Sequence, residues 1–343
     1  MTTPETQADS KIAASDRLVR YRDLIPCRTA FVDTYTPGSD QKENFTIIGP
    51  GVSESPDQHV HISLPHGFNI GGARQPPHCV NSQHSHETAE VFVVQSSRWA
   101  FFFGQDAADG AVELEPGDVI SIPTHIFRGF ENVGDDVGFL FAVLGGDDPG
   151  HVTWAPYVFE KAAEHGLQLM ENHQLIDKTK GETPPDGVKP MEPTSREAAA
   201  RFHIPNAEQR AGCVQHRADL TPAAASVMGR IAGVSESPII GQASQAEGLP
   251  AGKFDWPHGF SLRQWRLEPG AHIPDHRRGE EEVVFVHAGT LAIATGGDRV
   301  TMTPGDTFTT PIGQTRSFHN PGDTPALVYV VRRNDVPTAA EWT

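Results

Sequence analysis

The stretch His84-Ser85-His86-Glu87-Thr88-Ala89-Glu90 is the most informative part of the chain, and it has a counterpart 192 residues further along. At that offset, the two histidines and the last glutamate fall on His276, Arg278 and Glu282. Arginine stays protonated and cannot act as an ordinary metal ligand. The chain therefore contains one module twice, and only the first copy keeps three side chains of the metal-binding kind.

Shorter repeats on both sides of this stretch support the duplication. Three further segments occur twice: 51–56 and 233–238 (Gly-Val-Ser-Glu-Ser-Pro), 65–68 and 257–260 (Pro-His-Gly-Phe), and 116–118 and 304–306 (Pro-Gly-Asp). Repeated segments spread over this length indicate two copies of a domain rather than a short-period solenoid.

The composition fits two ordinary globular domains. The chain has 343 residues, of which 37% are hydrophobic and 8% aromatic, and its 28 prolines and 33 glycines are typical of all-β proteins with many turns. The formal charge of −17 argues against a nucleic-acid or anionic-membrane partner. No segment has a signal core or membrane-spanning length, and Cys27, Cys79 and Cys213 are sparse and far apart. We expect a cytoplasmic protein in a reducing compartment.

Short apolar runs bounded by turn residues predict the strands of both modules. In the first module these runs are 91–95, 99–103, 112–114, 119–122 and 138–144. In the second they are 282–287, 291–295, 300–302, 307–310 and 326–331. Many short strands at this spacing indicate a sandwich or jelly-roll barrel. The predicted parts are an N-terminal arm (1–44), a first barrel (45–150), a linker with short helices (151–212) and a second barrel (213–343).

The arm and the linker carry weaker signals. In the arm, we expect a short helix over 16–24 and a strand over 31–35. In the linker, 154–166 has helical composition and ends at a glycine, and Thr194-Ser195-Arg196-Glu197 is typical of a second helix start.

The spacing of His84, His86 and Glu90 predicts a metal site. On a β-strand, even offsets place side chains on one face, so two imidazoles and a carboxylate would project into the barrel together. Two histidines and one carboxylate suit Fe(II), and also Mn, Ni or Zn. We expect one divalent metal ion per chain, with Fe(II) favoured.

These motifs resemble those of the cupin superfamily, which has H-x-H, three residues and E, then P-G-D, then P-x-G-x-x-H-x-x-x-N. The first module matches at His84, His86, Glu90, 116–118, Pro123 and Asn132. The second matches at His276, Glu282, Gly289, 304–306, Pro311, Gly313 and Asn320. The resemblance covers both modules and implies an all-β bicupin of two tandem jelly-roll barrels. It is weak for the reaction, because cupins host many activities.

The chain departs from the cupin pattern at positions that bear on the site. Arg128 and Arg316 stand where the family has its fourth ligand, a histidine, and His78, Ser97 and His125 stand where it usually has glycine. Arg128 allows two interpretations: it pairs with Glu90 in a metal-free site, or it binds an anionic substrate group beside the metal. We expect His125 to act with Arg128 in catalysis. His78, Phe103 and Phe130 are further candidates for contact with the substrate or the ligands.

The second module has a poor metal site. Arg278 and Arg316 place two guanidinium groups beside one imidazole and one carboxylate. We expect internal ion pairs in a structural barrel, with an anion-binding pocket as the alternative.

The resemblance leaves the reaction open between classes. The favoured hypothesis is a dioxygenase of the quercetinase-like bicupin kind, acting with O2 on a small anionic, enolisable or phenolic substrate. The alternatives are a non-oxidative lyase, isomerase or decarboxylase of a small carboxylate, and a metal-free binding or structural bicupin. By analogy with cupins, we also expect a homodimer.

Overall fold

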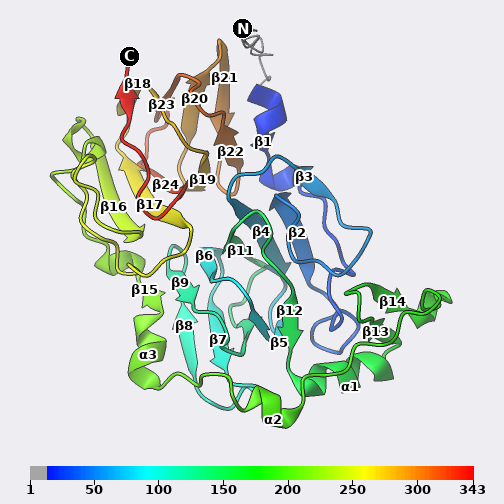
Figure 1. Cartoon of the computed structure of the whole chain (residues 1–343). Coiled ribbons are helices and arrows are strands. Elements are labelled where there is room, and N and C mark those ends of the chain that lie inside the picture. Colours follow the sequence, from blue (N-terminus) through cyan, green and yellow to red (C-terminus); the bar gives the residue numbers. More distant parts are fainter. Residues whose placement is uncertain (1–13) are drawn as a thin grey trace, which may run out of the picture.

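The computed structural model describes residues 14–343, which form two β-barrels joined by a linker (Figure 1). Each barrel is a jelly roll built from two facing sheets whose strands are almost all antiparallel. Every strand predicted for the two modules is present. The short apolar runs were sufficient to find these strands because turn residues bound each one.

The first barrel has a seven-stranded and a five-stranded sheet. The larger sheet runs, in spatial order, β15 (Val214–Gln215), β9 (Val119–Ile122), β6 (Glu90–Ser96), β11 (Gly138–Gly145), β4 (Phe68–Gln75), β2 (Glu43–Ile48) and β3 (Val60–Ile62). The smaller sheet runs β12 (Val152–Trp154), β5 (Val80–His86), β10 (Arg128–Asn132), β7 (Trp99–Phe103) and β8 (Ala111–Leu114). Part of the core between them is aromatic: the ring of Phe130 lies 5.2 Å from that of Phe92 and 5.4 Å from that of Phe101.

The second barrel repeats this plan with a six-stranded and a five-stranded sheet. The larger sheet runs β1 (Leu18–Val19), β22 (Thr307–Thr310), β19 (Glu282–Ala288), β24 (Ala326–Arg333), β17 (Phe260–Leu267) and β16 (Val234–Ile240). The smaller sheet runs β21 (Asp298–Met302), β20 (Leu291–Thr295), β23 (Arg316–His319), β18 (His272–Arg277) and β25 (Glu341–Trp342).

The two barrels exchange edge strands. β1, which precedes the first barrel in sequence, pairs with β22 of the second, and β15, which precedes the second, pairs with β9 of the first. The aspartates of the repeated Pro-Gly-Asp segments anchor these strands: Asp306 accepts from the Tyr21 N–H at 3.0 Å, and Asp118 accepts from the Arg217 N–H at 2.8 Å. The duplicated segments therefore serve the contact between the barrels.

The repeated Pro-His-Gly-Phe segments meet the opposite barrel in the same reciprocal way. His66 Nε2 lies 2.6 Å from Thr309 Oγ1, and His258 Nε2 lies 2.7 Å from Ser121 Oγ. Between these contacts the rings of Phe141 and Phe285 stack, with centroids 4.1 Å apart. The apolar core that these rings share extends across both barrels and joins them.

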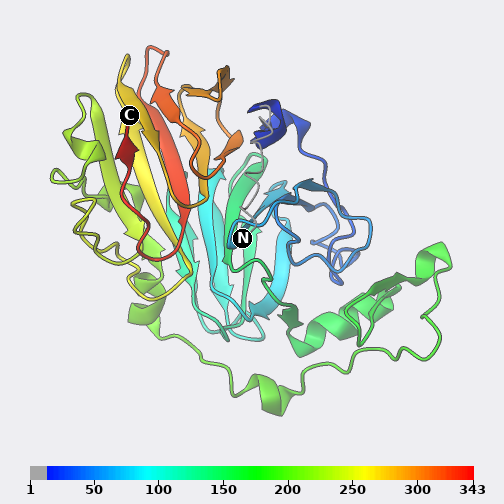
Figure 2. The same ribbon diagram turned by 45° about the horizontal axis from the view of Figure 1, so that its top comes forward.

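The linker lies along one end of the first barrel (Figure 2). It contains α1 (Pro156–Glu164), β13 (Leu167–Leu169), β14 (Leu175–Asp177), α2 (Arg196–Ala199) and α3 (Ala207–Gly212). The two predicted linker helices correspond to α1 and α2, and the Ser195 side chain caps α2 by accepting from the Ala198 N–H at 3.1 Å.

Both predictions for the arm were wrong, and its first 13 residues lie outside the described part of the chain. Residues 16–24 do not form one helix, because β1 in their middle is held extended by pairing with β22. Residues 31–35 form consecutive turns, since the Thr34 N–H bonds to the Phe31 carbonyl at 3.0 Å. Within residues 14–343, no helix has the length and apolar character needed to cross a bilayer.

Candidate metal centre

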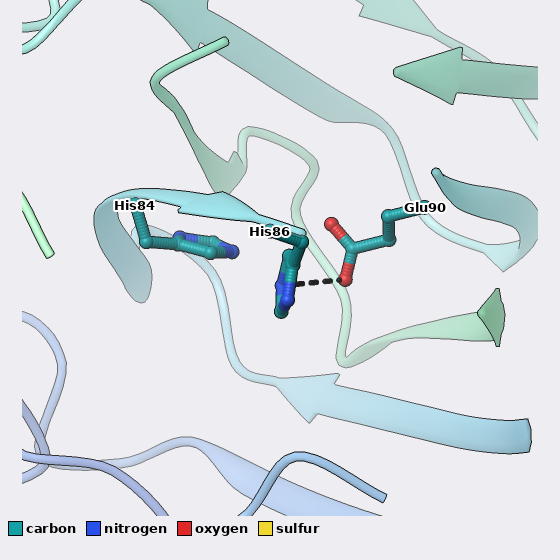
Figure 3. Close-up of side chains that lie close together, drawn as sticks. All are labelled: His84, His86 and Glu90. Carbon is teal, nitrogen blue, oxygen red and sulfur yellow. Dashed lines mark ion pairs between the residues drawn. The ribbon is translucent and has the colours of Figure 1, made fainter. Parts of the chain in front are cut away.

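The first barrel brings the side chains of His84, His86 and Glu90 close together (Figure 3). One ligand-type atom from each lies within 4.8 Å of the others, and all three side chains are buried. The two histidines project from β5, as their spacing predicts, but Glu90 begins the next strand, β6. The turn between the strands, rather than a single straight strand, brings the carboxylate opposite the imidazoles.

The protonation states fit a divalent metal ion. Burial, reinforced by the nearby Arg128 charge, holds the pKa of His84 well below its usual range, and burial also lowers the pKa of His86. Burial alone would raise the pKa of Glu90, but Arg128 and then His86 hold it below its ordinary value. Two neutral imidazoles and an ionised carboxylate are the forms that bind metals.

The hydrogen bonding of His84 leaves its Nε2 atom free to bind a metal. Its Nδ1 lies 2.7 Å from the Ser82 carbonyl oxygen, which can only accept, so Nδ1 carries the proton. Nε2 is then the unprotonated nitrogen that can bind a metal. A backbone acceptor that fixes a histidine in this way is a common feature of metal sites.

Arg128 is paired with Glu90, although the pair leaves part of the carboxylate free. Nη2 of Arg128 donates to Oε2 of Glu90, whereas Oε1 faces His86 Nε2 at 3.4 Å. The ion pair that the first interpretation of Arg128 requires is therefore present. Because each oxygen faces a different partner, the pair orients the carboxylate without removing its second oxygen from the site.

A cavity of about 70 Å³ adjoins the cluster. Its walls are mostly apolar and include Phe92, Phe130 and Trp154. Asn44 and Asn81 are polar members of the lining, and the side-chain amide nitrogen of Asn44 is buried without a hydrogen-bond partner. An engineered apolar cavity that binds benzene measures about 150 Å³, so this one suits a molecule of only a few heavy atoms.

Asn81 is held by an ion pair from the arm. The buried ammonium group of Lys42 pairs with Asp33 and donates to Oδ1 of Asn81 at 3.0 Å. An ammonium can only donate, so the Asn81 oxygen must face it, and the amide nitrogen lies 3.3 Å from the protonated Nδ1 of His84, which cannot accept from it. Asn81 lies three residues before His84, and on a regular strand this odd offset places the two side chains on opposite faces. The sequence therefore did not point to Asn81. One extra residue in β5 opposite β10, a β-bulge, restores both to the same face.

Of the four other predicted site residues, only one lines the cavity. Phe130 lines the cavity, and its ring lies 6.4 Å from that of His84. Phe103 is fully buried in the core and is absent from the cavity lining. His78 and His125 are exposed and do not line the cavity.

Backbone geometry explains the positions of His78 and His125. Their φ angles are 62° and 59°, in the left-handed region, and Ser97 is at 65°. The corresponding positions of the second barrel, Gly270 and Gly313, have φ angles of 76° and 72°. These are turn positions that favour glycine, so the two histidines lie on tight turns at the surface.

The second barrel holds a buried charge network at the position that corresponds to His84, His86 and Glu90. Arg316 Nε lies 3.3 Å from Glu282 Oε1, and Arg332 Nε lies 3.4 Å from Glu282 Oε2. Burial would raise the pKa of Glu282, but Arg316, Arg332 and Arg278 lower it to about 2. Internal ion pairs at this site are as predicted. The sequence did not reveal that five further charged residues join the network: Glu236, Glu247, Arg263, Glu280 and Arg332.

Comparison with known proteins agrees with this architecture. The model of the cupin domain matches residues 263–332, within the second barrel. The chain folds like the oxalate decarboxylase of Lactobacillus farciminis in its formate complex, with a TM-score of 0.56 over 95% of this chain and 88% of that one, at 13% identity. This chain has the two-barrel fold of a bicupin, and its second barrel matches the cupin domain.

Two further matches place the bicupin among its relatives. The oxalate decarboxylase of Bacillus subtilis gives a TM-score of 0.55 over 94% of this chain and 77% of that one, at 11% identity. A germin-like protein of Mesembryanthemum crystallinum is 33% identical over 111 residues, which make up 30% of the bicupin and 47% of that protein. The bicupin thus spans about half the length of this curated relative. At such low identity, the likeness to the solved structures describes the fold alone.

Proposed function

We propose that this bicupin is a metal-dependent enzyme that acts on a small carboxylate without consuming O2, as a decarboxylase or a related lyase. The observation that carries the proposal is the small, mostly apolar cavity beside His84, His86 and Glu90. These three residues would hold one divalent ion, with Fe(II) and Mn(II) both suited to the donor set. A flavonol or another polycyclic phenol is several times too large for about 70 Å³.

The charge of the site favours an anionic ligand. A divalent ion, the ionised Glu90 and the protonated Arg128 together leave an excess of positive charge in a buried space, because both imidazoles are neutral. Low dielectric surroundings strengthen its attraction for an anion. A carboxylate would supply the missing negative charge, and this supports a carboxylic acid substrate over a neutral one.

Two amide groups are placed to orient such a substrate. The unpartnered Nδ2 of Asn44 and the NH2 group of Asn81 both belong to residues of the cavity lining. Hydrogen bonds from fixed donors to a carboxylate hold it in one orientation and lower the entropic part of the barrier. The Lys42 ammonium fixes the Asn81 amide, so this donor is positioned before substrate binds.

The proposed reaction needs no oxidant. When bound, the metal would supply Lewis-acid polarisation of a carboxylate oxygen. In a decarboxylation, the bond between the carboxylate carbon and its neighbour breaks, CO2 leaves, and the electron pair stays on the remaining fragment, which takes up a proton. The rings of Phe92, Phe130 and Trp154 would keep bulk water away from that fragment. The structural relatives named as oxalate decarboxylases add support to this class.

A dioxygenase is the second candidate, and one observation favours it. Three protein ligands leave up to three coordination positions, enough for a substrate and O2 side by side. The test is a screen of short mono- and dicarboxylates with Fe(II) or Mn(II), run in parallel under air and under argon, with CO2 and O2 measured. We expect CO2 to be released without a proportional consumption of O2. Product formed only under air, with O2 consumed in proportion, would reject the decarboxylase and support the dioxygenase.

A further inference from the structure

The cavity of the first barrel offers one proton donor besides the proposed metal ligands. Among the described residues that line it, the side chains that can ionise are Cys27, His84, His86 and Glu90. The two histidines and the glutamate would bind the metal through unprotonated atoms. The fragment that remains after CO2 leaves must take up a proton, and the Cys27 thiol is the group left to supply it.

The pairing of the arm with β2 turns Cys27 toward the cavity. The Cys27 N–H donates to the Asn44 carbonyl at 2.8 Å, and the Asn44 N–H donates to the Cys27 carbonyl at 3.3 Å, so the two residues form an antiparallel bridge. Residues directly opposite each other in such a pair present their side chains on the same face. Phe45 packs away from the barrel interior against Phe139, so its neighbour Asn44 faces the interior. Cys27 and Asn44 both line the cavity.

Two polar groups mark this cavity as a ligand site independently of the thiol. His86 is only 3% exposed and lines the cavity, and its Nδ1 has no hydrogen-bond partner among the described residues. Directly across from Cys27, the amide nitrogen of Asn44 is likewise buried without a partner. Buried polar atoms are normally hydrogen-bonded, so a bound ligand is the expected partner here. A buried thiol with apolar neighbours alone would be only a small space-filling side chain.

The duplication provides an internal comparison for Cys27. The segment Asp-Leu-x-Pro occurs at 23–26 and again at 219–222, each time after a single turn of 3-10 helix. The next residue is Cys27 in the first copy and Ala223 in the second. The module with the complete set of metal-binding side chains therefore also has the thiol, and the module with the charge network lacks both.

We propose that the Cys27 thiol is the general acid of the first barrel, which protonates the fragment left when CO2 departs. The bond to the carboxylate carbon breaks, and its electron pair stays on the fragment. This pair forms a bond to the thiol proton, the S–H bond breaks, and Cys27 is left as a thiolate. A proton from solvent restores the thiol as the product leaves. The proposal deepens the proposed function and rests on it.

The two hydroxyl groups of the cavity lining are poorer donors than the thiol. Thr46 Oγ1 donates to Gln58 Oε1 at 2.8 Å, and Ser53 Oγ donates to the Ala30 carbonyl at 3.2 Å. Both hydroxyl protons are therefore engaged with protein acceptors. A thiol is also a much stronger acid than an alcohol, so Cys27 releases a proton to a basic fragment more readily.

Iodoacetate tests the position of the thiol, because it is both a two-carbon carboxylate and an alkylating reagent for thiols. With its carboxylate in the proposed substrate position, its reactive carbon lies where Cys27 would deliver a proton. The sulfur then forms a bond to that carbon, and iodide leaves. Iodoacetamide, a neutral reagent of the same size, is the matched control. Wild type loaded with Mn(II) is treated with each reagent, and peptide mass spectrometry follows each cysteine.

The measured quantity is the rate with iodoacetate divided by the rate with iodoacetamide. At Cys27 we expect this ratio to exceed that of the denatured protein by about tenfold or more, because the bound carboxylate holds the reagent against the thiol. Added propionate should slow the iodoacetate reaction. Cys213 has the same exposure of 8% but does not line the cavity, so its ratio should not exceed that of the denatured protein. A ratio at Cys27 no higher than in the denatured protein, or no alkylation of Cys27 by either reagent, overturns the proposal.

A conservative variant separates proton donation from a structural role. Cys27→Ser keeps the shape of the side chain but is a weaker acid. We expect its kcat to fall about 100-fold or more, while KM and metal content stay at the wild-type values. Cys213→Ser, the matched control, should keep all three values.

The two proposals fail in different ways. A wild-type kcat in Cys27→Ser would overturn the role of the thiol and leave the decarboxylase standing. A wild type that alkylates Cys27 as expected but releases no CO2 from any carboxylate would instead reject the proposed function. The alkylation measurement uses wild type alone, so it decides the position of the thiol even if Cys27→Ser does not fold.

Discussion

Arg128 and Glu90 form a buried ion pair in which the guanidinium contacts one carboxylate oxygen while the other oxygen faces His86. The arginine stands where cupins usually have a fourth histidine ligand. Here it contacts Glu90, one of the three proposed metal ligands, instead of offering an imidazole of its own. The sequence analysis treated the Arg128–Glu90 ion pair and a metal site as alternatives. Because the second carboxylate oxygen stays free of Arg128, the two are compatible.

The first prediction concerns the number and place of the metal ions. Wild type should bind one divalent ion per chain, because Arg278 and Arg316 occupy ligand positions of the second barrel. His86→Ala should lose the ion, whereas His78→Ala, at an exposed turn, should keep it. Metal analysis after dialysis measures this. Two ions per chain, or equal content in His86→Ala and wild type, would contradict it.

The second prediction separates the two roles of Arg128. Arg128→Met keeps most of the side-chain volume but leaves Glu90 without its partner. Because groups that orient metal ligands typically contribute 10- to 100-fold to affinity, we expect metal binding to weaken by about that factor. Titration with a competing chelator gives the affinity. A variant that binds metal more tightly than wild type would show that the ion pair blocks the site.

The third prediction concerns the charge network of the second barrel. Arg332 contacts Glu247 and Glu282, so Arg332→Met leaves buried carboxylates without a partner and should destabilise the protein by about 3–5 kcal/mol. The control is Arg266→Met, which removes an ion pair that is about half exposed and should cost less than about 1 kcal/mol. Urea unfolding compares the two. Equal midpoints for both variants would show that the network does not stabilise the barrel.

The fourth prediction is a loss of stability in acid that depends on His258. Its Nδ1 donates to the Trp256 carbonyl at 2.6 Å, and its Nε2 lies 2.7 Å from Ser121 Oγ, whose hydroxyl can donate to an unprotonated nitrogen of a neutral ring. Burial lowers its pKa to about 4, below the unfolded value near 6.5. The folded state therefore binds fewer protons between these values, and stability present above pH 6.5 is lost as the pH falls toward 4.

For this one group the loss amounts to about 3 kcal/mol. In His258→Asn the free energy of unfolding should vary less with pH over this range, even though the variant is less stable at pH 7. Urea unfolding at several pH values provides the comparison. Parallel pH curves for the two proteins would show that His258 does not titrate in this way.

Sequence patterns alone predicted the barrels because their signals are local. Short apolar runs between turn residues gave the strands, and the duplication gave two domains. His84 and His86 were predictable because alternate residues of a strand share a face. The second barrel lacks a complete ligand set in the sequence itself, since Arg278 stands in place of a histidine.

Only the tertiary structure placed the residues whose roles depend on contacts between distant segments. Asn81 faces His84 because a bulge in β5 changes its side, and Cys27 lies opposite Asn44 because the arm pairs with β2. His78 and His125 had the right chemistry but lie on left-handed turns that expose them. The sequence determined which side chains of the strands face inward through the strand period, whereas bulges, turns and the path of the arm decided which other groups reach the cavity.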